Sequence, residues 1–201
     1  MDEIVRLAMA KWPNVPYCYG WLALDARGGW RMRDERAQAN KLPGDRINNA
    51  ALLSFINRNY THDEHGRWYF QNGPQRVYVD LEATPYIARL DQPGRFLLHT
   101  GDPLEKIDTA WMNEDGLLIL QAGDIVAQID DRDMAQCLGF LRSGESGELA
   151  ASDEELMEWL TTTSEDESPL YLRNGDRMLP IKRIARAALS SHFGFNPQPR
   201  A

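Results

Sequence analysis

The sequence has few of the features that mark a secreted or membrane-spanning protein. Its 201 residues include only two cysteines, Cys18 and Cys137, which are far apart and outside any CxxC spacing. Secreted domains more often carry a disulfide framework, so reduced thiols are expected. No apolar run approaches the roughly 20 residues that cross a bilayer, and residues 1–11 lack the continuous apolar core of a signal peptide. These absences predict a cytoplasmic protein without a membrane partner.

Positive charge is also scarce. The chain has 22 Lys and Arg against 30 Asp and Glu, a formal net charge of −8. Neutralising phosphates requires clustered Lys and Arg, so this balance predicts no nucleic-acid partner. The charge is unevenly placed, since residues 153–167 contain acids and no base. Either these acids pair with the basic residues of 173–200 within the fold, or they form a regulatory or oligomer contact. A further and weaker hypothesis is that the basic stretch 173–186 holds an anionic ligand or a nucleic acid.

Motifs that would indicate catalysis or a cofactor are missing. There is no Gly-x-Ser-x-Gly, no Ser-x-x-Lys and no glycine-rich phosphate loop. His62-Asp63-Glu64-His65 is the one dense group of metal-ligand types, but its spacing is also that of a solvated turn. We therefore predict no catalytic residue, no metal and no cofactor. The sequence favours a protein that is not an enzyme.

Three β-hairpin patterns recur at nearly constant spacing. Apolar triplets precede Gly73, Gly123 and Gly175, which are separated by 50 and 52 residues. Asn-Gly at the first and third of these turns suits the tight reversal that joins two right-twisted antiparallel strands. Both an internal duplication and a chance recurrence of turn residues fit this spacing.

Amphipathic segments between the hairpins predict short helices. One is expected to follow a cap at Asp45, and another to begin at the capping box that Ser152 opens. The other two are expected over residues 132–141 and 182–192. The predicted fold class is α+β, with antiparallel hairpins packed against short helices in two related halves.

The expected organisation is an N-terminal α+β unit over residues 1–92 and a C-terminal α+β unit over 93–201. The Gly- and Ser-rich stretch 142–151 is the linker candidate. The proline-containing tail, 194–201, is expected to fray.

Between Tyr19 and Leu141 the chain resembles a proteobacterial family of unknown function. The resemblance lies in structural motifs: Gly29-Trp30, Ile47 with Leu52 and Phe55, Asp63 to Trp68, Pro74, Val77-Tyr78-Val79, Thr84-Pro85-Tyr86 and Leu97 to Asp102. It implies two related α+β halves made of repeated motifs, no established activity, and a role in signalling.

Arginine and aromatic side chains alternate around the first hairpin. This composition is typical of protein contact sites and of pockets for anionic ligands. Alternatively, Arg76 stacks on Trp68 or Tyr78 as ordinary hairpin packing. The predicted binding residues are Arg58, Tyr60, Trp68, Asn72, Arg76 and Tyr78.

Two functions remain open. The first is a non-enzymatic interaction or regulatory protein, acting as a homodimer with an unknown protein partner through extendable hairpin edges. The alternative is a small-molecule-binding module, or an enzyme, whose site is assembled only in three dimensions. A deep pocket holding His99 beside an acid with a shifted pKa would favour this alternative.

Overall fold

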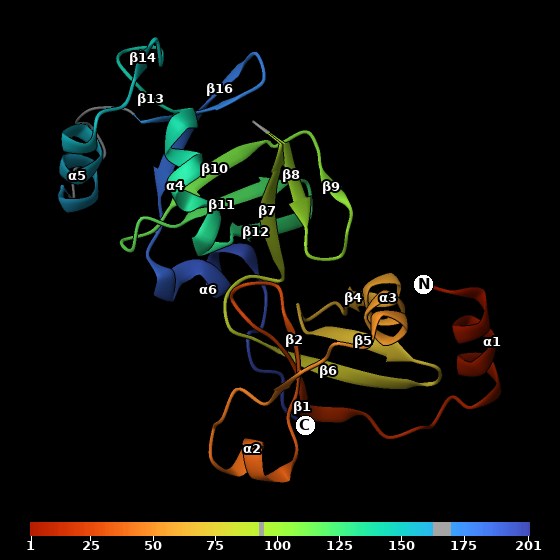
Figure 1. Ribbon diagram of the computed structural model, residues 1–201. Coiled ribbons are helices and arrows are strands. Elements are labelled where there is room, and N and C mark those ends of the chain that lie inside the picture. Colours follow the sequence, from red (N-terminus) through yellow and green to blue (C-terminus); the bar gives the residue numbers. More distant parts are fainter. Residues whose placement is uncertain (93–94, 163–169) are drawn as a thin grey trace. The chain divides into compact units, whose positions relative to one another are not determined.

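The computed structural model describes residues 1–92, 95–162 and 170–201. The chain divides into two compact units (Figure 1). Unit 1 consists of Met1–Pro85 and Ser190–Ala201, and unit 2 of Tyr86–Leu189. The predicted boundary is at residue 92, with the whole C-terminal part in the second unit. The boundary lies earlier because residues 86–92 form a strand that pairs only with strands of unit 2.

Unit 1 contains a six-stranded sheet in the order β3-β2-β1-β6-β5-β4. All neighbouring strands are antiparallel except β1 and β6, which are parallel. The elements are α1 (Glu3–Lys11), β1 (Cys18–Leu24), β2 (Trp30–Met32), α2 (Glu35–Ala39), β3 (Asp45–Arg46), α3 (Ala50–Arg58), β4 (Tyr60–His62), β5 (Trp68–Asn72), β6 (Gln75–Leu81) and, apart from its first residue, α6 (Leu189–Phe193).

The core of unit 1 lies between α3 and one face of this sheet. Leu22 and Val79 are cross-strand partners on that face, and both are buried. The ring of Phe55 on α3 meets Phe70 of β5 edge-on at 5.3 Å. Burial of these side chains is what holds α3 on the sheet.

The helix α3 begins later than its predicted cap. Asp45 and Arg46 form the short strand β3, which pairs with β2. The N-cap is Asn49, whose side chain accepts a hydrogen bond from the backbone N–H of Leu52 at 2.9 Å. Both Asp and Asn are good caps, and pairing with β2 decides between them.

Unit 2 contains a ten-stranded sheet in the order β14-β13-β15-β16-β10-β11-β12-β7-β8-β9. Its elements are β7 (Tyr86–Gln92), β8 (Arg95–Leu98), β9 (Pro103–Leu104), β10 (Thr109–Met112), β11 (Leu118–Ala122), β12 (Ile125–Ile129), α4 (Met134–Cys137), β13 (Leu141–Ser143), β14 (Leu149–Ala150), α5 (Asp153–Thr161), β15 (Tyr171–Asn174) and β16 (Arg177–Arg183), with 3₁₀ turns at Asp131–Asp133, Leu138–Phe140 and Arg186–Ala188.

Three expectations for this unit are corrected by the structure. The linker candidate 142–151 forms the hairpin of β13 and β14, in which Arg142 pairs with Ala150. The helix expected over 132–141 is broken into two 3₁₀ turns and the single turn of α4. The helix expected over 182–192 is also wrong at its start, because residues 182 and 183 end strand β16.

The predicted reversals at the three glycines are confirmed. Gly73, Gly123 and Gly175 have φ values of +55°, +56° and +61°, a left-handed conformation that glycine adopts without steric cost. They join β5 to β6, β11 to β12 and β15 to β16 in antiparallel pairs. The second strand of each hairpin also pairs in parallel with an earlier strand: β6 with β1, β12 with β7, and β16 with β10. The fold is α+β, as predicted.

Equivalent turns in the two units share their hydrogen bonds at a spacing of 50 residues. Asp63 Oδ1 accepts from the backbone N–H groups two and four residues later, at 3.0 and 3.1 Å. Asn113 Oδ1 accepts from the corresponding groups at 3.1 and 2.9 Å. Gln71 and Gln121 each donate from Nε2 to the carbonyl of the glycine two residues later, at 2.9 and 3.4 Å. The same pattern of side-chain hydrogen bonds therefore occurs at these two positions.

The tail 194–201 does not fray in the structure. The N–H of Asn196 donates to the carbonyl of Gly66 at 2.9 Å, and the N–H of Leu81 donates to the carbonyl of Pro197 at 2.8 Å. Arg200 reaches the carboxylate of Asp80 at 2.6 Å. These contacts make the tail a part of unit 1.

Candidate functional site

Two of the predicted binding residues belong to the aromatic core of unit 1. The ring of Tyr60 is buried, and its hydroxyl donates to the carbonyl oxygen of Pro85 at 2.9 Å. The ring of Trp68 packs against Tyr60 and His62, each at a centroid distance of 4.8 Å. Both side chains are thus engaged in packing.

Two others lie at separate positions on the surface of unit 1. Arg58, at the end of α3, forms an ion pair with Asp2 at 3.3 Å and donates to the hydroxyl of Ser54. Asn72 is exposed at the end of β5, where it pairs with Gln75 of β6. Neither residue joins the remaining predicted pair.

Arg76 and Tyr78 do come together, on the face of the sheet opposite α3. The guanidinium of Arg76 lies over the rings of Tyr69 and Tyr17, at 4.6 and 5.4 Å from their centroids. The buried ring of Tyr78 stacks on Tyr19 at 4.7 Å. Arg76 therefore stacks on Tyr69 and Tyr17, whereas Trp68 is one residue out of step and points to the core face. We call Tyr17, Tyr19, Tyr69, Arg76 and Tyr78 the tyrosine cluster.

The carboxylate of Asp63, which lies beside this cluster, finds its hydrogen-bond donors within the protein. Burial raises the pKa of Asp63, but hydrogen bonds from the backbone N–H of Arg67, the hydroxyl of Tyr78 and the guanidinium of Arg67 lower it further than burial raises it. The distances from Asp63 Oδ2 to Tyr78 Oη and Arg67 Nε are 3.0 and 2.8 Å. Asp63 is therefore ionised at neutral pH and fully used within the fold.

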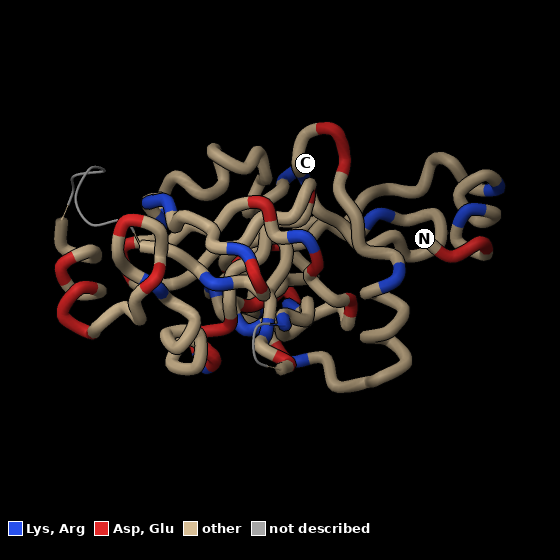
Figure 2. Tube along the Cα trace, turned by 90° about the horizontal axis from the view of Figure 1, so that it is seen from above, with Lys and Arg blue, Asp and Glu red and all other residues tan. Residues whose placement is uncertain are grey.

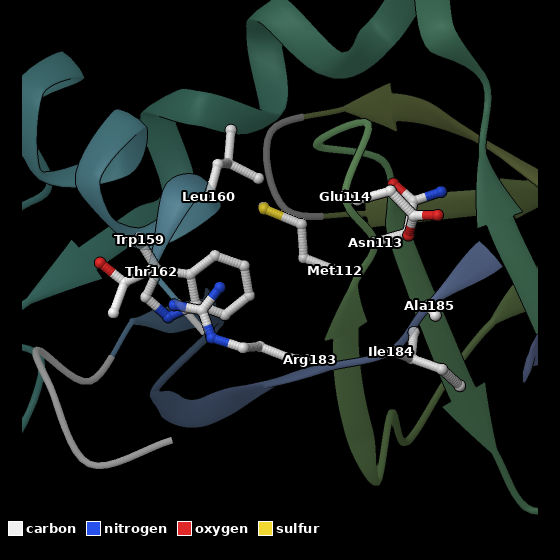
Figure 3. A pocket seen from close by; sticks show the side chains of 9 residues that line it. All are labelled: Met112, Asn113, Glu114, Trp159, Leu160, Thr162, Arg183, Ile184 and Ala185. Carbon is white, nitrogen blue, oxygen red and sulfur yellow. The ribbon is translucent and has the colours of Figure 1, made fainter. Parts of the chain in front are cut away.

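A cavity of 490 Å³ opens in unit 2, where the ends of β10 and β16 face the end of α5 (Figure 3). This size lies within the usual range for small-molecule sites. Its wall combines apolar side chains with a few polar ones. The lining residues are Met112, Asn113, Glu114, Trp159, Leu160, Thr162, Arg183, Ile184 and Ala185.

Strand alternation explains why an arginine points into this cavity. In β16 the side chains of Leu179 and Ile181 are buried in the core of unit 2, and Arg183 is the next residue on the same face. Met112 of β10 is the cross-strand partner of Arg183. Arg183 therefore occupies the last position of an inward-facing row that is otherwise apolar.

The guanidinium of Arg183 is held by an aromatic ring, without an anion in the described part of the chain. Its central carbon lies 3.8 Å from the centroid of a Trp159 ring, a cation–π distance. Its Nη2 is buried and has no hydrogen-bond acceptor among the described residues. Burial lowers the pKa of Arg183, yet an arginine stays protonated in proteins. The charge is therefore present and unsatisfied.

A second unsatisfied donor lines the same cavity. Asn113 is 1% exposed, and its Nδ2 has no hydrogen-bond partner among the residues described. Its counterpart Asp63 forms the same turn, but the second side-chain oxygen there is occupied by Arg67 and Tyr78. Unit 2 thus retains a free donor at the position that unit 1 closes internally.

A smaller cavity of 280 Å³ in unit 1 is lined by charged side chains that neutralise one another. Arg33 pairs with Asp80 at 2.6 Å, and Arg31 pairs with Asp25 at 2.8 Å. Because these cations already have their anions, this cavity offers less to an anionic ligand than the one in unit 2.

The acidic segment 153–167 does not neutralise the basic strand in the part that the structure describes. Residues 163–167 lie outside the described residues. The described acids gather on α5, in the first turn and beyond it (Figure 2), and no ion pair joins them to β16 within the described ranges. Glu155 accepts hydrogen bonds from the hydroxyl of Ser143 at 3.1 Å and from the N–H of Ser152 at 2.7 Å, which confirms the predicted capping box.

The other candidates for chemistry have ordinary roles in the structure. Among the described residues, no group of three or more His, Cys, Asp and Glu side chains is placed to hold a metal. His99 does not line the cavity of unit 2; its Nδ1 accepts from the N–H of Ile87 at 3.2 Å. Nor does any described helix combine the length and apolar character needed to cross a membrane.

The comparisons with known proteins identify a family. The family model described as "Protein of unknown function (DUF2946)" matches residues 1–200, and the chain belongs to this family. The predicted resemblance to a family of unknown function is confirmed. No curated protein matches the chain, and no specific function follows from these comparisons.

Two solved structures are similar to this chain. One is a DUF1285 family protein from Silicibacter pomeroyi DSS-3, with 15% identity, 90% of this chain and 96% of that chain covered, and a TM-score of 0.51. The other is a DUF1285 family protein from Shewanella baltica OS155, with 12% identity, 58% and 88% coverage, and a TM-score of 0.40. The first likeness supports the fold alone.

Neither Arg183 nor Trp159 is among the six predicted binding residues, although Arg183 belongs to the basic stretch 173–186 for which an anionic ligand is a hypothesis. A signal for Arg183 was present in the sequence, since Leu179, Ile181 and Arg183 alternate with Pro180 and Lys182. This pattern assigns a basic residue to a buried row. The pairing with Trp159 has no comparable local signal, because the two residues lie on different elements.

Proposed function

We propose that this protein is a non-enzymatic, small-molecule-binding regulatory protein, and that the unit 2 cavity takes an organic anion. The observation that carries the proposal is the guanidinium of Arg183, which is stacked on Trp159 with a buried nitrogen that lacks an acceptor. A buried donor without an acceptor costs roughly 1 to 3 kcal/mol. A bound anion would remove this cost, because a guanidinium donates well to a carboxylate.

The rest of the cavity wall suits the body of such a ligand. Met112, Leu160 and Ile184 provide apolar surface to the cavity (Figure 3). Thr162 also lines it, on the side of Trp159. A mostly apolar wall with a few placed polar groups is the usual composition of a small-molecule site. The proposed ligand is therefore an amphipathic molecule with an anionic head and an apolar chain.

Isothermal titration of octanoate against the full chain tests the proposal. The Arg183→Met variant should weaken binding by about 10- to 100-fold, which corresponds to the 1.5 to 3 kcal/mol of a hydrogen bond to a charged group. Lys182→Met is the matched control, since Lys182 is exposed on the opposite face of the same strand. Equal affinity in wild type and Arg183→Met would contradict the proposal, as would the absence of binding at millimolar octanoate.

A further control addresses competition from the chain's own acids. Glu165, Asp166 and Glu167 lie outside the described residues, and the titration is repeated with all three replaced by their amides. A rise in octanoate affinity in this variant would show that a carboxylate of the protein competes for the same guanidinium. Sensitivity to Arg183→Met should persist in either background.

We propose that the two units arose by internal duplication and that only one of them binds a ligand. The shared hydrogen bonds at Asp63 and Asn113 support a common origin. In unit 1 the position is closed by Arg67 and Tyr78, and in unit 2 it remains open beside a cavity. Unit 2 is thus the proposed ligand-binding copy.

Exposed apolar side chains favour a second function, the formation of a homodimer or of a complex with a protein partner. In α1, Ile4 and Leu7 are 73% and 64% exposed. Arg76 and Tyr17 of the tyrosine cluster add the residue types that are enriched at protein interfaces. We also propose that the protein acts in cytoplasmic signalling, and that the binding of the ligand and the binding of the partner influence each other. Light scattering after size-exclusion chromatography checks the dimer, and a monomer at tens of micromolar would contradict it.

A further inference from the structure

We infer that Glu114 determines the specificity of the unit 2 cavity, by restricting its ligand to a chain with one anionic head and a neutral or cationic far end. This inference rests on the proposed function, in which Arg183 binds the head. It adds the chemistry of the opposite end of the ligand, which that proposal leaves open.

Met112 lies between the two charged residues on the cavity wall. Arg183 is the cross-strand partner of Met112, the last residue of β10, and Glu114 lies two residues later, in the turn that follows this strand. In Figure 3 the guanidinium of Arg183 and the side chain of Glu114 lie on opposite sides of Met112. A ligand that extends from Arg183 across Met112 therefore approaches Glu114 with its far end.

The carboxylate of Glu114 is fixed in place and charged. Hydrogen bonds from its own backbone N–H and from the N–H of Arg186 lower its pKa, and the second of these measures 2.9 Å. The guanidinium of Arg186 pairs with Asp115, at 3.5 Å. The rim of the cavity thus carries an oriented negative charge at neutral pH.

A second negative charge on the ligand would face this carboxylate. Two like charges that come close together repel each other measurably even at the high effective dielectric of a protein rim. The expected penalty is about tenfold in affinity at low salt, and it should shrink as added salt screens the pair. An ammonium group at the same end would be attracted instead.

Three ligands of equal chain length separate these effects: octanoate, octanedioate and 8-aminooctanoate. Titration calorimetry on the wild type should give octanedioate about tenfold weaker binding than octanoate, with 8-aminooctanoate at least as tight as octanoate. In Glu114→Gln the penalty for octanedioate should fall to less than about twofold. Glutamine keeps an oxygen for the N–H of Arg186, so this variant should remain folded.

Asp115→Asn is the matched control. Asp115 is adjacent and exposed but does not line the cavity, so the wild-type ranking of the three ligands should survive in this variant. An unchanged ranking in Glu114→Gln, with Arg183→Met still weakening octanoate binding, would overturn the inference and leave the proposed function standing. Failure of all three ligands to bind, or an affinity that Arg183→Met leaves unchanged, would overturn both.

Discussion

Replacing Arg183 by methionine should leave the ligand-free protein as stable as the wild type, or stabilise it. The substitution removes a buried nitrogen without an acceptor, a cost of roughly 1 to 3 kcal/mol. It also removes the cation–π contact with Trp159, which is worth about 0.5 to 2 kcal/mol. Methionine is flexible and regains part of that energy through a sulfur–aromatic contact. The balance is a change between zero and about 1 kcal/mol in favour of the variant.

Differential scanning calorimetry without ligand measures this balance. For a unit of about 100 residues, a stabilisation of 1 kcal/mol raises Tm by roughly 4 to 8 °C. The control is Ile181→Ala, on the same buried row of β16, which should cost about 2 to 5 kcal/mol as a cavity-forming change. A loss of more than about 1.5 kcal/mol in Arg183→Met would refute the reasoning, because it would give Arg183 a structural role in the absence of a ligand.

Two further predictions concern stability. In urea unfolding, Gly66→Ala should lower the free energy of unfolding several times more than Gly123→Ala. Both glycines have a positive φ, but a Cβ at Gly66 would lie 1.9 Å from the carbonyl oxygen of Gly194, whereas nothing lies within 4 Å of a Cβ at Gly123. Equal losses would contradict the turn geometry. Burial raises the pKa of Cys137 to about 12 from its usual 9.0. Above pH 9 the unfolded thiol loses its proton while the folded one keeps it, so the free energy of unfolding should fall by about 1.4 kcal/mol per pH unit up to pH 12. Cys137→Ala should show a shallower decline in the same titration, and an identical slope would rule out this thiol as its source.

The hairpins could be predicted because turn chemistry is local. A glycine that must take a positive φ between two apolar runs carries its signal within about ten residues, and Gly73, Gly123 and Gly175 are all of this kind. The start of a helix was predicted less well where two residues can both cap it and a tertiary contact decides between them. Asn49 caps α3 in place of Asp45 because β3 pairs with β2.

The candidate site was predicted only in part, because composition does not say which face of a strand a residue occupies. Of the six predicted residues, Arg76 and Tyr78 come together, whereas Trp68 lies one position out of step with Tyr69 and faces the core. A shift of one residue along a strand exchanges the two faces of the sheet. The basic stretch 173–186 drew attention to the region of Arg183, but its cavity could not be predicted because it depends on the approach of α5 to β16.

The return of Ser190–Ala201 to unit 1 has a consequence for how the protein is made. The carbonyl of Gly66 and the carboxylate of Asp80 accept hydrogen bonds from this segment, and the N–H of Leu81 donates one to it. Unit 1 therefore begins before unit 2 along the chain and is completed after it. Unit 2 is encoded without interruption and can assemble during translation. Until residues 190–201 emerge, Gly66, Asp80 and Leu81 lack these partners, and a premature stop near residue 189 would remove contacts from unit 1 although it falls after unit 2.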